Sequence, residues 1–307
     1  MRRTGVWLSA VAAFAIMGGG GLVGVGMLRK GAGDGQPLAG TFSGAPTPTA
    51  SVTPVRTGPS PQELAAQRRA GQMKALTAAL TKYAATVPEF SVAVLDRKTG
   101  RRYAFRGSER YETASVVKVQ VLACLLLDAQ EDGRDLTPTE LSLAKRMIRY
   151  SDNDATTALF SRLGRAPAVS RSNKRFGLTE TRVSSAWGLT RTTVDDQVKL
   201  LDELVDEHGP LDAGSRRLAL TLMSTVDDEQ DWGVPAVAKP GETATVKNGW
   251  LPRSTEGGRW IINSVGRVTG DDVDVSIAVL SHDHRRMSGG IRVVEKVAEL
   301  TRHYLEY

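Results

Sequence analysis

The chain has 307 residues, of which 41% are hydrophobic and 24% are charged, an ordinary balance for a globular protein with one large or two small domains. The formal net charge of +6 comes mainly from residues 1–60, which hold five Lys or Arg side chains and one acid. The rest of the chain has no Lys/Arg-rich run, so the clustered positive charge that binds nucleic acid is missing. We therefore expect no nucleic-acid partner.

Residues 1–30 have the composition of an export signal. Their uncharged segment, 6–28, follows two arginines, precedes a basic pair and is long enough to span a bilayer. No convincing Ala-x-Ala motif follows it, so a cleaved signal peptide and an N-terminal transmembrane anchor both remain open. Residues 31–61 are rich in Pro, Thr and Gly and are predicted to be a linker. We expect residues 62–307 to form an exported monomeric domain, either secreted or held on the extracellular face of the cell membrane through the N-terminal segment.

Hydrophobic periodicity predicts both helices and strands along the remaining chain. Two short strands, 90–96 and 101–105, flank Lys98-Thr99-Gly100, where Gly suits a hairpin turn. The other predicted elements are helices at 62–86, 115–130, 137–150, 154–163, 192–205 and 289–305, and strands at 259–268 and 274–282. Strands at both ends with helices between them indicate one α/β unit whose sheet joins the two ends of the domain.

Ser115-Val116-Val117-Lys118 places a hydroxyl and an amine one helical turn apart at the start of an apolar helix. A serine becomes an effective nucleophile when a neutral amine can accept its proton, and a lysine is neutral near pH 7 when it is desolvated or close to another cation. The pattern is weak by itself, because Ser142-Leu143-Ala144-Lys145 also matches it within a predicted amphipathic helix. Taken singly, each copy favours a structural role.

Two further motifs follow. Ser151-Asp152-Asn153 supplies a hydroxyl and an amide, although Ser151 followed by Asp154 also fits a helix N-cap. Lys247-Asn248-Gly249 follows a strand-like segment, 242–246, and supplies a cation. Asn-Gly is also the strongest short signal for a hairpin, so in isolation the turn is the favoured interpretation.

The order of the three motifs resembles that of the penicillin-recognising serine hydrolases, which include the class A β-lactamases. The resemblance extends over about residues 75–307. It implies an α/β sandwich, in which an antiparallel sheet is flanked by helices and joined to a helical subdomain. The family's order excludes Lys98, which precedes Ser115, and Ser142, which lies too close to Ser151.

The resemblance implies roles for individual residues and implies neither a metal nor a cofactor. Ser115 would be the acylated nucleophile, Lys118 its general base and Ser151 the donor of a proton to the leaving nitrogen. The oxyanion hole would be formed by the backbone N–H groups of Ser115 and Trp250. The other predicted substrate contacts are an amide contact from Asn153, carboxylate contacts from Lys247, Arg259 and Asn248 (which replaces a hydroxyl), and a close backbone approach at Gly249.

The glutamate that activates the deacylating water in class A β-lactamases has no counterpart here. Residues 155–194 contain one carboxylate, Glu180, which lies upstream of the expected position, and the segment at that position, 184–190, has neither an acid nor an amide. We therefore expect β-lactams or peptidoglycan-like peptides to acylate Ser115. We expect β-lactam turnover to be slow or absent, with Lys118 as the base in both half-reactions.

Two other classes of function remain open. A catalytically inactive module could retain the pocket to bind cell-wall peptides or β-lactams, and a plain surface anchor would require three ordered motifs to arise by accident. His282-Asp283-His284 lacks a third ligand, so we expect no metal site there. Cys124 lies in an apolar helix and is expected in the core. Trp232, Trp250 and Trp260 fit a cleft lining or core packing equally well.

Overall fold

The structure is a computed structural model that describes residues 58–307. The predicted signal or anchor, 1–30, and most of the predicted linker lie outside the described residues. Within the part of the chain that the structure describes, no helix is both long and apolar enough to cross a membrane. The first helix, α1 (Pro61–Ala84), begins at a capping box formed by Ser60 and Glu63.

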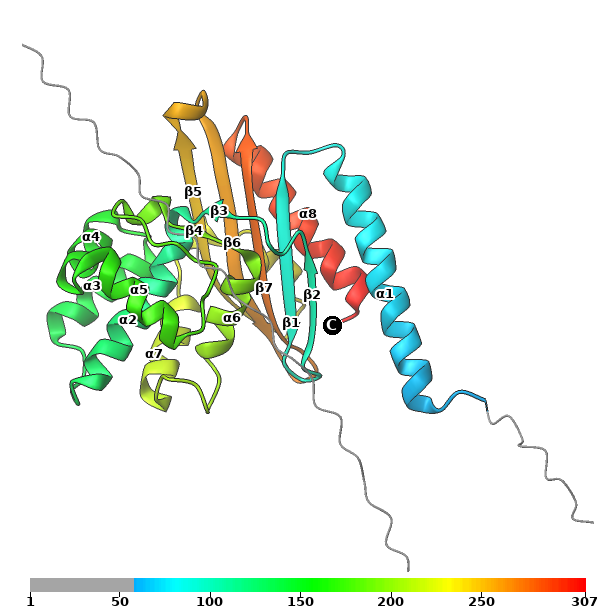
Figure 1. The fold of residues 1–307 in the computed structure, drawn as a ribbon, viewed down its shortest axis with the longest axis horizontal. Coiled ribbons are helices and arrows are strands. Elements are labelled where there is room, and N and C mark those ends of the chain that lie inside the picture. Colours follow the sequence, from blue (N-terminus) through cyan, green and yellow to red (C-terminus); the bar gives the residue numbers. More distant parts are fainter. Residues whose placement is uncertain (1–57) are drawn as a thin grey trace, which may run out of the picture. The chain divides into compact units, whose positions relative to one another are not determined.

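A five-stranded antiparallel sheet forms the centre of the fold, with the strand order β2–β1–β7–β6–β5 (Figure 1). The strands are β1 (Phe90–Asp96), β2 (Arg101–Phe105), β5 (Thr243–Arg253), β6 (Arg259–Thr269) and β7 (Asp274–His284). Every residue of β1 is paired with β7, so the N-terminal hairpin and the C-terminal strands share one sheet. This confirms the predicted fold class.

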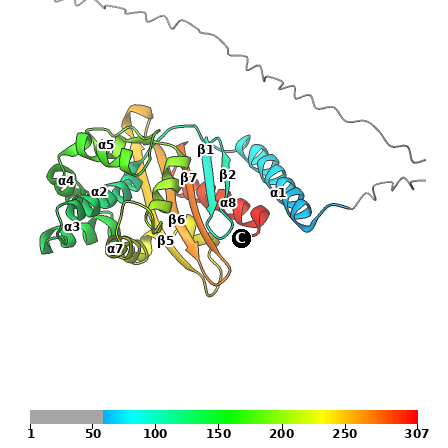
Figure 2. The same ribbon diagram turned by 60° about the horizontal axis from the view of Figure 1, so that its bottom comes forward.

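Helices cover both faces of the sheet, as Figures 1 and 2 show. On one face α8 (Met287–Leu305) packs against β6 and β7, and α1 packs against α8. On the other face α6 (Val194–Glu203) packs against the same central strands. Adjacent residues of β7 serve different faces: Val279 belongs to the apolar cluster that includes α8, and Leu280 to the cluster that includes α6. The period of two thus builds two cores on one sheet.

A helical subdomain lies beside this sheet (Figure 1). Its central helix, α2 (Val117–Glu131), is buried along almost its whole length, as its apolar composition predicts. The surrounding helices are α3 (Pro138–Arg149), α4 (Asn153–Arg162), α5 (Arg165–Arg175) and α7 (Ala213–Met223). Helices α5 and α7 were not predicted, and α5 is highly polar.

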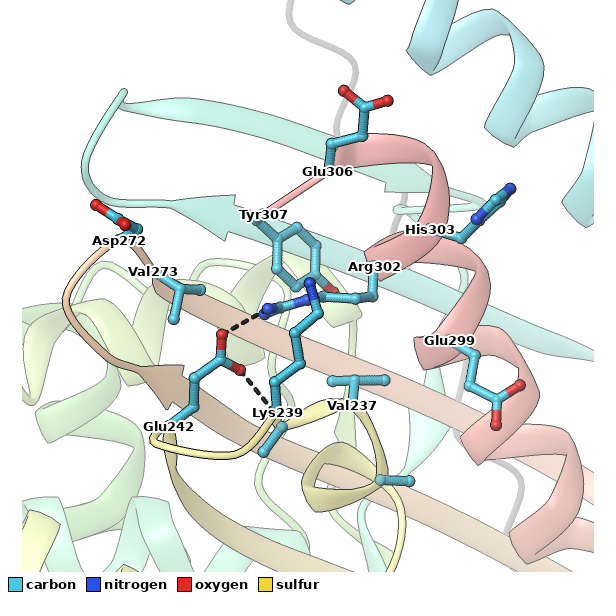
Figure 3. Close-up of a pocket in the computed structure, with 12 residues that line it drawn as sticks. Val237, Lys239, Glu242, Asp272, Val273, Glu299, Arg302, His303, Glu306 and Tyr307 are labelled. Carbon is cyan, nitrogen blue, oxygen red and sulfur yellow. Dashed lines mark hydrogen bonds and ion pairs between the residues drawn. The ribbon is translucent and has the colours of Figure 1, made fainter.

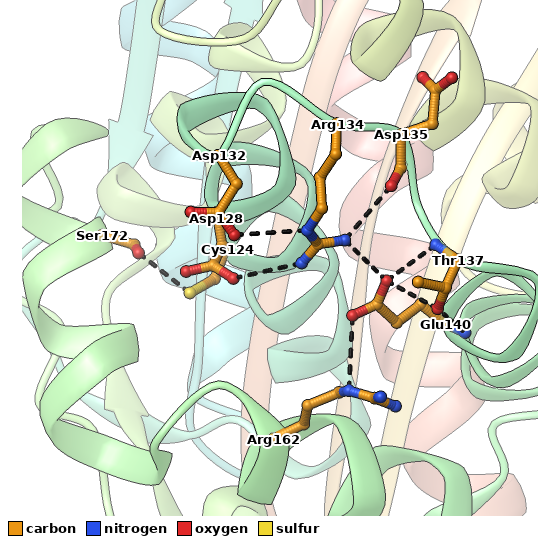
Figure 4. A network of polar contacts seen from close by, with 9 residues as sticks. All are labelled: Cys124, Asp128, Asp132, Arg134, Asp135, Thr137, Glu140, Arg162 and Ser172. Atoms are coloured by element: carbon orange, nitrogen blue, oxygen red, sulfur yellow. Dashed lines mark hydrogen bonds and ion pairs between the residues drawn. The ribbon is translucent and has the colours of Figure 1, made fainter.

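A polar network ties α2, α3 and α4 together (Figure 4). The buried carboxylate of Glu140 caps α3 with Thr137, and it forms ion pairs with Arg134 at 2.9 Å and with Arg162 of α4 at 3.5 Å. In the same view, the Sγ of Cys124 lies 3.0 Å from the Oγ of Ser172. Cys124 is buried, as predicted, and burial raises the pKa of its thiol to about 11, so this cysteine is a core residue.

The two Lys-x-Gly segments have different structures. Lys98-Thr99-Gly100 forms the turn between β1 and β2, with Gly100 at φ +67°, as predicted. Lys247-Asn248-Gly249 lies within a strand, as the order of the motifs predicts and against the local preference of Asn-Gly for a turn, because β5 pairs with β6 without interruption through these residues. The chain instead turns after β5, where two glycines at 257 and 258 have φ +64° and +76°.

Candidate active site

Ser115 lies on a 3-10 turn, η1 (Ala114–Val116), that leads directly into α2. Ala114 has φ +44°, a left-handed conformation that costs free energy in a residue other than glycine. From β6, Asn263 donates through Nδ2 to two carbonyls just before the turn, at 2.9 and 3.0 Å. The sheet therefore supports the strained backbone that presents Ser115.

Gly249 allows β5 to pack against this turn. A Cβ atom at this position would lie 2.8 Å from the backbone N atoms of Ser115 and Val116 and from the O atom of Thr113. Any other residue would therefore push β5 away from Ser115. The sequence led us to expect that Gly249 admits a substrate, whereas the structure shows it admitting a second backbone segment.

Lys118 is the centre of a hydrogen-bonded cluster. Its Nζ lies 2.8 Å from the Oγ of Ser115, 3.0 Å from the Oγ of Ser151 and 2.9 Å from the Oδ1 of Asn153, and it donates to the Ser151 carbonyl at 2.6 Å. Burial lowers the pKa of this amine to about 7, partly opposed by the carboxylate of Asp152. At neutral pH a large fraction of Lys118 is therefore uncharged and able to accept the Ser115 proton.

Ser151 connects Lys118 to Lys247. Its backbone has φ +55°, and its Oγ lies 3.0 Å from the Nζ of Lys118 and 3.2 Å from the Nζ of Lys247. The expectation that Ser151 caps the next helix is wrong, because Asp152 accepts the capping bond from the N–H of Ala155 at 2.9 Å. The Ser151 hydroxyl is thereby left to bridge the two amines.

Lys247 is completely buried. Its Nζ contacts three acceptors: the Oγ of Ser151 at 3.2 Å, the Oε1 of Gln230 at 3.1 Å and the carbonyl of Asn248 at 3.0 Å. Burial, and then the charge of Lys118, lower the pKa of this amine well below its ordinary value. The charged form of Lys247 is therefore disfavoured both by burial and by the nearby amine of Lys118.

Asn248 holds a neighbouring segment in place. Its buried Nδ2 donates to the carbonyls of Gln230 and Trp232, at 2.8 and 2.9 Å. These bonds fasten η3 (Asp228–Gln230) and the residues after it to β5. The side-chain amide of Asn248, predicted to contact a substrate carboxylate, is therefore engaged within the protein.

Trp250 is half-buried on β5, near Lys247. The Nζ of Lys247 lies 5.9 Å from the centre of its ring, and the ring of Trp232 meets it edge-on with a centroid separation of 6.1 Å. A pair of aromatic rings thus lies beside the amine of Lys247.

Arg259 is not brought to this cluster. It pairs across the sheet with Arg253, six residues along β5 from Lys247, which corresponds to about 20 Å along the strand. Its guanidinium pairs instead with the carboxylate of Asp283 at 3.7 Å. The prediction that Arg259 anchors a substrate carboxylate beside Lys247 is not supported by this placement.

Trp187 lies beside Lys118 and belongs to the segment in which the expected glutamate is missing. It lies on η2 (Trp187–Leu189), within the acid-free segment 184–190, and its ring centre is 5.1 Å from the Nζ of Lys118. Its Nε1 donates to the Oγ1 of Thr157 at 3.2 Å, which fixes the indole. The nearest candidate acid in the sequence, Glu180, pairs with Arg110 instead.

Sequence reasoning missed Gln230, Trp187 and Asn263 as site residues. Each is placed by long-range contacts and belongs to no recognisable motif: Gln230 contacts Lys247 from η3, and Asn263 reaches the Ser115 turn from the next strand. For Trp187 a signal was present, because an aromatic residue stands in the segment where an acid was expected.

A cavity elsewhere on the fold is lined by none of the predicted site residues. It is a cavity of about 710 Å³, bounded by η4 (Val234–Val237), the β6–β7 turn and α8 (Figure 3). Arg302 and Glu242 form a 2.5 Å ion pair there, and Arg302 also lies over the ring of Tyr307. These contacts join α8 to the start of β5.

Among residues 58–307, no cluster of three or more His, Cys, Asp or Glu side chains has the arrangement of a metal site. In the predicted His282-Asp283-His284 segment, His284 is buried against the hydroxyl of Ser281. Burial lowers the pKa of His284 to about 4, so it is a neutral core residue at physiological pH.

The model of a family described as the beta-lactamase enzyme family matches residues 72–142 and 135–305. Among curated proteins, "Putative lipoprotein LppW" of Mycobacterium tuberculosis is 32% identical over 184 residues, which cover 57% of this chain and 58% of that protein. The chain thus matches little more than half the length of this relative.

Solved class A β-lactamases have the same fold. TLA-1, an extended-spectrum β-lactamase, aligns with a TM-score of 0.68 at 16% identity and covers 77% of this chain and 100% of its own. A mutant of the class A enzyme of the last common ancestor of Gram-negative bacteria aligns with a TM-score of 0.66 at 20% identity, with coverages of 76% and 99%. A β-lactamase from Xanthomonas campestris gives 0.64 at 18%, with coverages of 76% and 97%.

Proposed function

The chain belongs to the beta-lactamase enzyme family, and from this premise we propose that it is a serine acyl-enzyme hydrolase that acts outside the cytoplasm. Its substrates would be β-lactams or peptidoglycan-like peptides. The observation that carries the proposal is the 2.8 Å separation of the Ser115 Oγ from the Nζ of Lys118, an amine with a pKa of about 7. A nucleophile and a base poised in this way have a direct use in acyl transfer.

In the acylation step, the Oγ of Ser115 would bond to the substrate carbonyl carbon while its proton passes to the neutral Nζ of Lys118. The backbone N–H groups of Ser115 and Trp250 would stabilise the oxyanion. When the C–N bond breaks, the leaving nitrogen would take a proton from the Oγ of Ser151. Lys118 would return a proton to Ser151 across their 3.0 Å contact, which leaves both groups as they began.

Deacylation would be slow, because Trp187 of the acid-free segment stands beside Lys118, and the nearby carboxylate of Asp152 is engaged in capping α4 and in an ion pair with Arg146. A water that hydrolyses the acyl group needs a base, and Lys118 is the one available to it in the cluster. The face of the Trp187 indole also covers one side of Lys118 and would exclude water from that side. We infer that the acyl-enzyme is long-lived.

The proposed location outside the cytoplasm draws on two observations. A basic pair followed by the uncharged segment 6–28 has the composition of an export signal, and the mycobacterial relative is named as a lipoprotein. The single cysteine of this sequence, Cys124, is buried in α2, so the attachment to the membrane would be through the apolar segment and not through a lipidated cysteine.

A second candidate function is a binding module that captures β-lactams or cell-wall peptides without turnover. Trp187 favours it, since an indole in place of an acid supports capture and opposes release. The two functions differ in that the hydrolase would release a reaction product, whereas the binding module would only hold its ligand.

Intact-mass spectrometry after incubation with a penicillin tests the proposal. We expect the wild type to gain the mass of one penicillin molecule, and we expect Ser115→Ala to gain none. Ser142→Ala is the matched control, because it removes the serine of the second Ser-x-x-Lys copy on an exposed position and should behave as wild type. A transient adduct favours hydrolysis and a persistent one favours a penicillin-binding role, whereas an unmodified wild type contradicts the acyl-enzyme and leaves the inactive binding module.

A further inference from the structure

The side-chain amide of Gln230 contacts Lys247, the cation that was expected to bind a substrate carboxylate. An ammonium has three N–H donors. At Lys247 the three acceptors within hydrogen-bond distance are Ser151, Gln230 and the Asn248 carbonyl, and no part of the side chain is exposed. Lys247 thus has neither a free donor nor an open path for a negatively charged substrate group.

The orientation of Gln230 is set by its other contacts. Its Nε2 donates to the carbonyl of Arg149 at 2.9 Å, so the oxygen of the same amide must face Lys247. Gln230 is itself almost completely buried. The amide oxygen therefore holds, by geometry, a position on Lys247 that a carboxylate oxygen would otherwise take.

The segment that carries Gln230 is held from two sides. Asn248 on β5 binds the carbonyls of Gln230 and Trp232. At the other end, the N–H of Asp227 donates to the carbonyl of Arg149 at 2.9 Å, and the Nε of Arg149 donates to the carbonyl of Thr225 at 2.8 Å. Two features are therefore linked through this segment. Asn248, which stands where the family has a hydroxyl, holds the segment, and the segment holds Gln230 against Lys247.

Neighbouring cations offer no substitute on this strand pair. Arg253 at the end of β5 pairs with Glu112 at 2.9 Å, and Arg259 at the start of β6 pairs with Asp283 at 3.7 Å. In the part of β5 and β6 that could flank a substrate, the positive charges are thus buried or paired with acids.

We propose that Gln230 is a specificity-determining residue, which keeps Lys247 from binding a substrate carboxylate and makes the site accept substrates that are uncharged beside the reacting carbonyl. The proposal rests on the acylation of Ser115 proposed above. Lys247 then acts on Ser151 and Lys118 within the cluster, and the half-buried ring of Trp250 lies 5.9 Å from its Nζ.

A pair of probes that differ in one charge tests this role. Benzylpenicillin and its methyl ester have the same lactam, and only the acid has a carboxylate. We expect wild-type protein to be acylated at similar rates by both, as followed by intact mass. In Gln230→Ala the acid should react about ten times faster than the ester, the order of effect expected for one new hydrogen bond to a charged group. Asn248→Ala should change the ratio in the same direction, since it releases the segment.

Two further variants guard against a trivial result. Gln230→Met preserves the side-chain length without the amide and should give the same change in ratio, even if the smaller alanine disturbs the fold. Gln72→Ala removes a glutamine that contacts Glu306, away from the site, and should leave the ratio unchanged.

The possible outcomes separate this inference from the function on which it rests. A wild type that prefers the acid tenfold or more contradicts the inference and leaves acylation standing. Equal rates in wild type and in both Gln230 variants also contradict it, because another feature must then block Lys247. If neither probe forms an adduct with any variant, the proposed function and the inference fall together.

Discussion

Lys118 and Lys247 lie on either side of the Ser151 hydroxyl, and both are buried, yet their surroundings differ. The partners of the Lys118 amine come from the Ser115 and Ser151 motifs, so each contact joins it to a reactive or adjacent group. One of the contacts of the Lys247 amine is instead with Gln230, which belongs to none of the three motifs. The surroundings of Lys118 are thus made by the sequence motifs. Those of Lys247 depend in part on the segment that carries Gln230, which lies outside the motifs.

The largest effect should come from removing the base. In Lys118→Met we expect acylation of Ser115 to slow by a factor on the order of 10³, because no amine remains to take the proton. In the wild type the rate should fall tenfold for each pH unit below about 7, where Lys118 becomes protonated, and should level off above it. Intact-mass time courses across pH measure both.

Lys145→Met provides the matched control, since Lys145 is the exposed lysine of the second Ser-x-x-Lys copy. It should keep the wild-type rate and pH profile. Rapid acylation of Lys118→Met would contradict the role of Lys118 as the base, because Lys118 would then be as dispensable for the reaction as Lys145.

An intermediate effect is expected at Trp187. In Trp187→Ala the half-life of the acyl-enzyme should shorten about tenfold, since removing the indole admits water beside Lys118, although it supplies no new base. The decay of the adduct mass after removal of free penicillin measures this half-life.

Thr157→Val sharpens that test, because it removes the hydrogen bond to the indole and leaves the ring in place. Its adduct should decay at close to the wild-type rate. An unchanged half-life in Trp187→Ala would show that water reaches the acyl group by a route the indole does not cover.

The smallest effect concerns stability. Lys247→Met should raise the free energy of unfolding by about 1 kcal/mol at pH 7, because it removes a buried amine whose charged form is penalised. The corresponding rise in melting temperature is about 2–4 °C. The folded pKa of Lys247 lies below its unfolded value, so the unfolded chain binds more protons and wild-type stability should rise with pH. The advantage of the variant should therefore shrink as the pH approaches 10.

Thermal unfolding of both proteins between pH 7 and 10 measures this difference. Lys239→Met, which changes an exposed lysine, should show no comparable rise. A variant less stable than wild type would mean that the three hydrogen bonds of Lys247 outweigh the cost of burying its amine.

The predictable part of the site is the part made by local geometry. Ser115 and Lys118 meet because they are one helical turn apart, a relation visible in the sequence. The order of motifs also identified β5 against the local preference of Asn-Gly for a turn. There, the pairing of β5 with β6 over eleven positions outweighs the preference of two residues.

The unpredicted part depends on the paths of loops. Gln230 reaches Lys247 through a segment without periodicity, and Arg259 was placed near Lys247 only by its position after the strand. Strand register decides the position of Arg259: the β5–β6 turn lies beyond Arg253, so Arg259 ends at the far end of the pair. The distance between Arg259 and Lys247 depends on where the β5–β6 hairpin turns, and the alternation of apolar and polar residues in the sequence did not reveal that position.

The pairing of β1 with β7 has a consequence for the order in which the protein is made. Phe90 pairs with Ser281, so the second edge of β1 stays without its partner until almost the whole chain has been synthesised. A sheet closed by contacts this distant in sequence folds slowly, because the cost of closing the loop precedes the gain from pairing. Completion of the domain is therefore a late event, and any cellular step that acts on the unfolded chain has that interval in which to act.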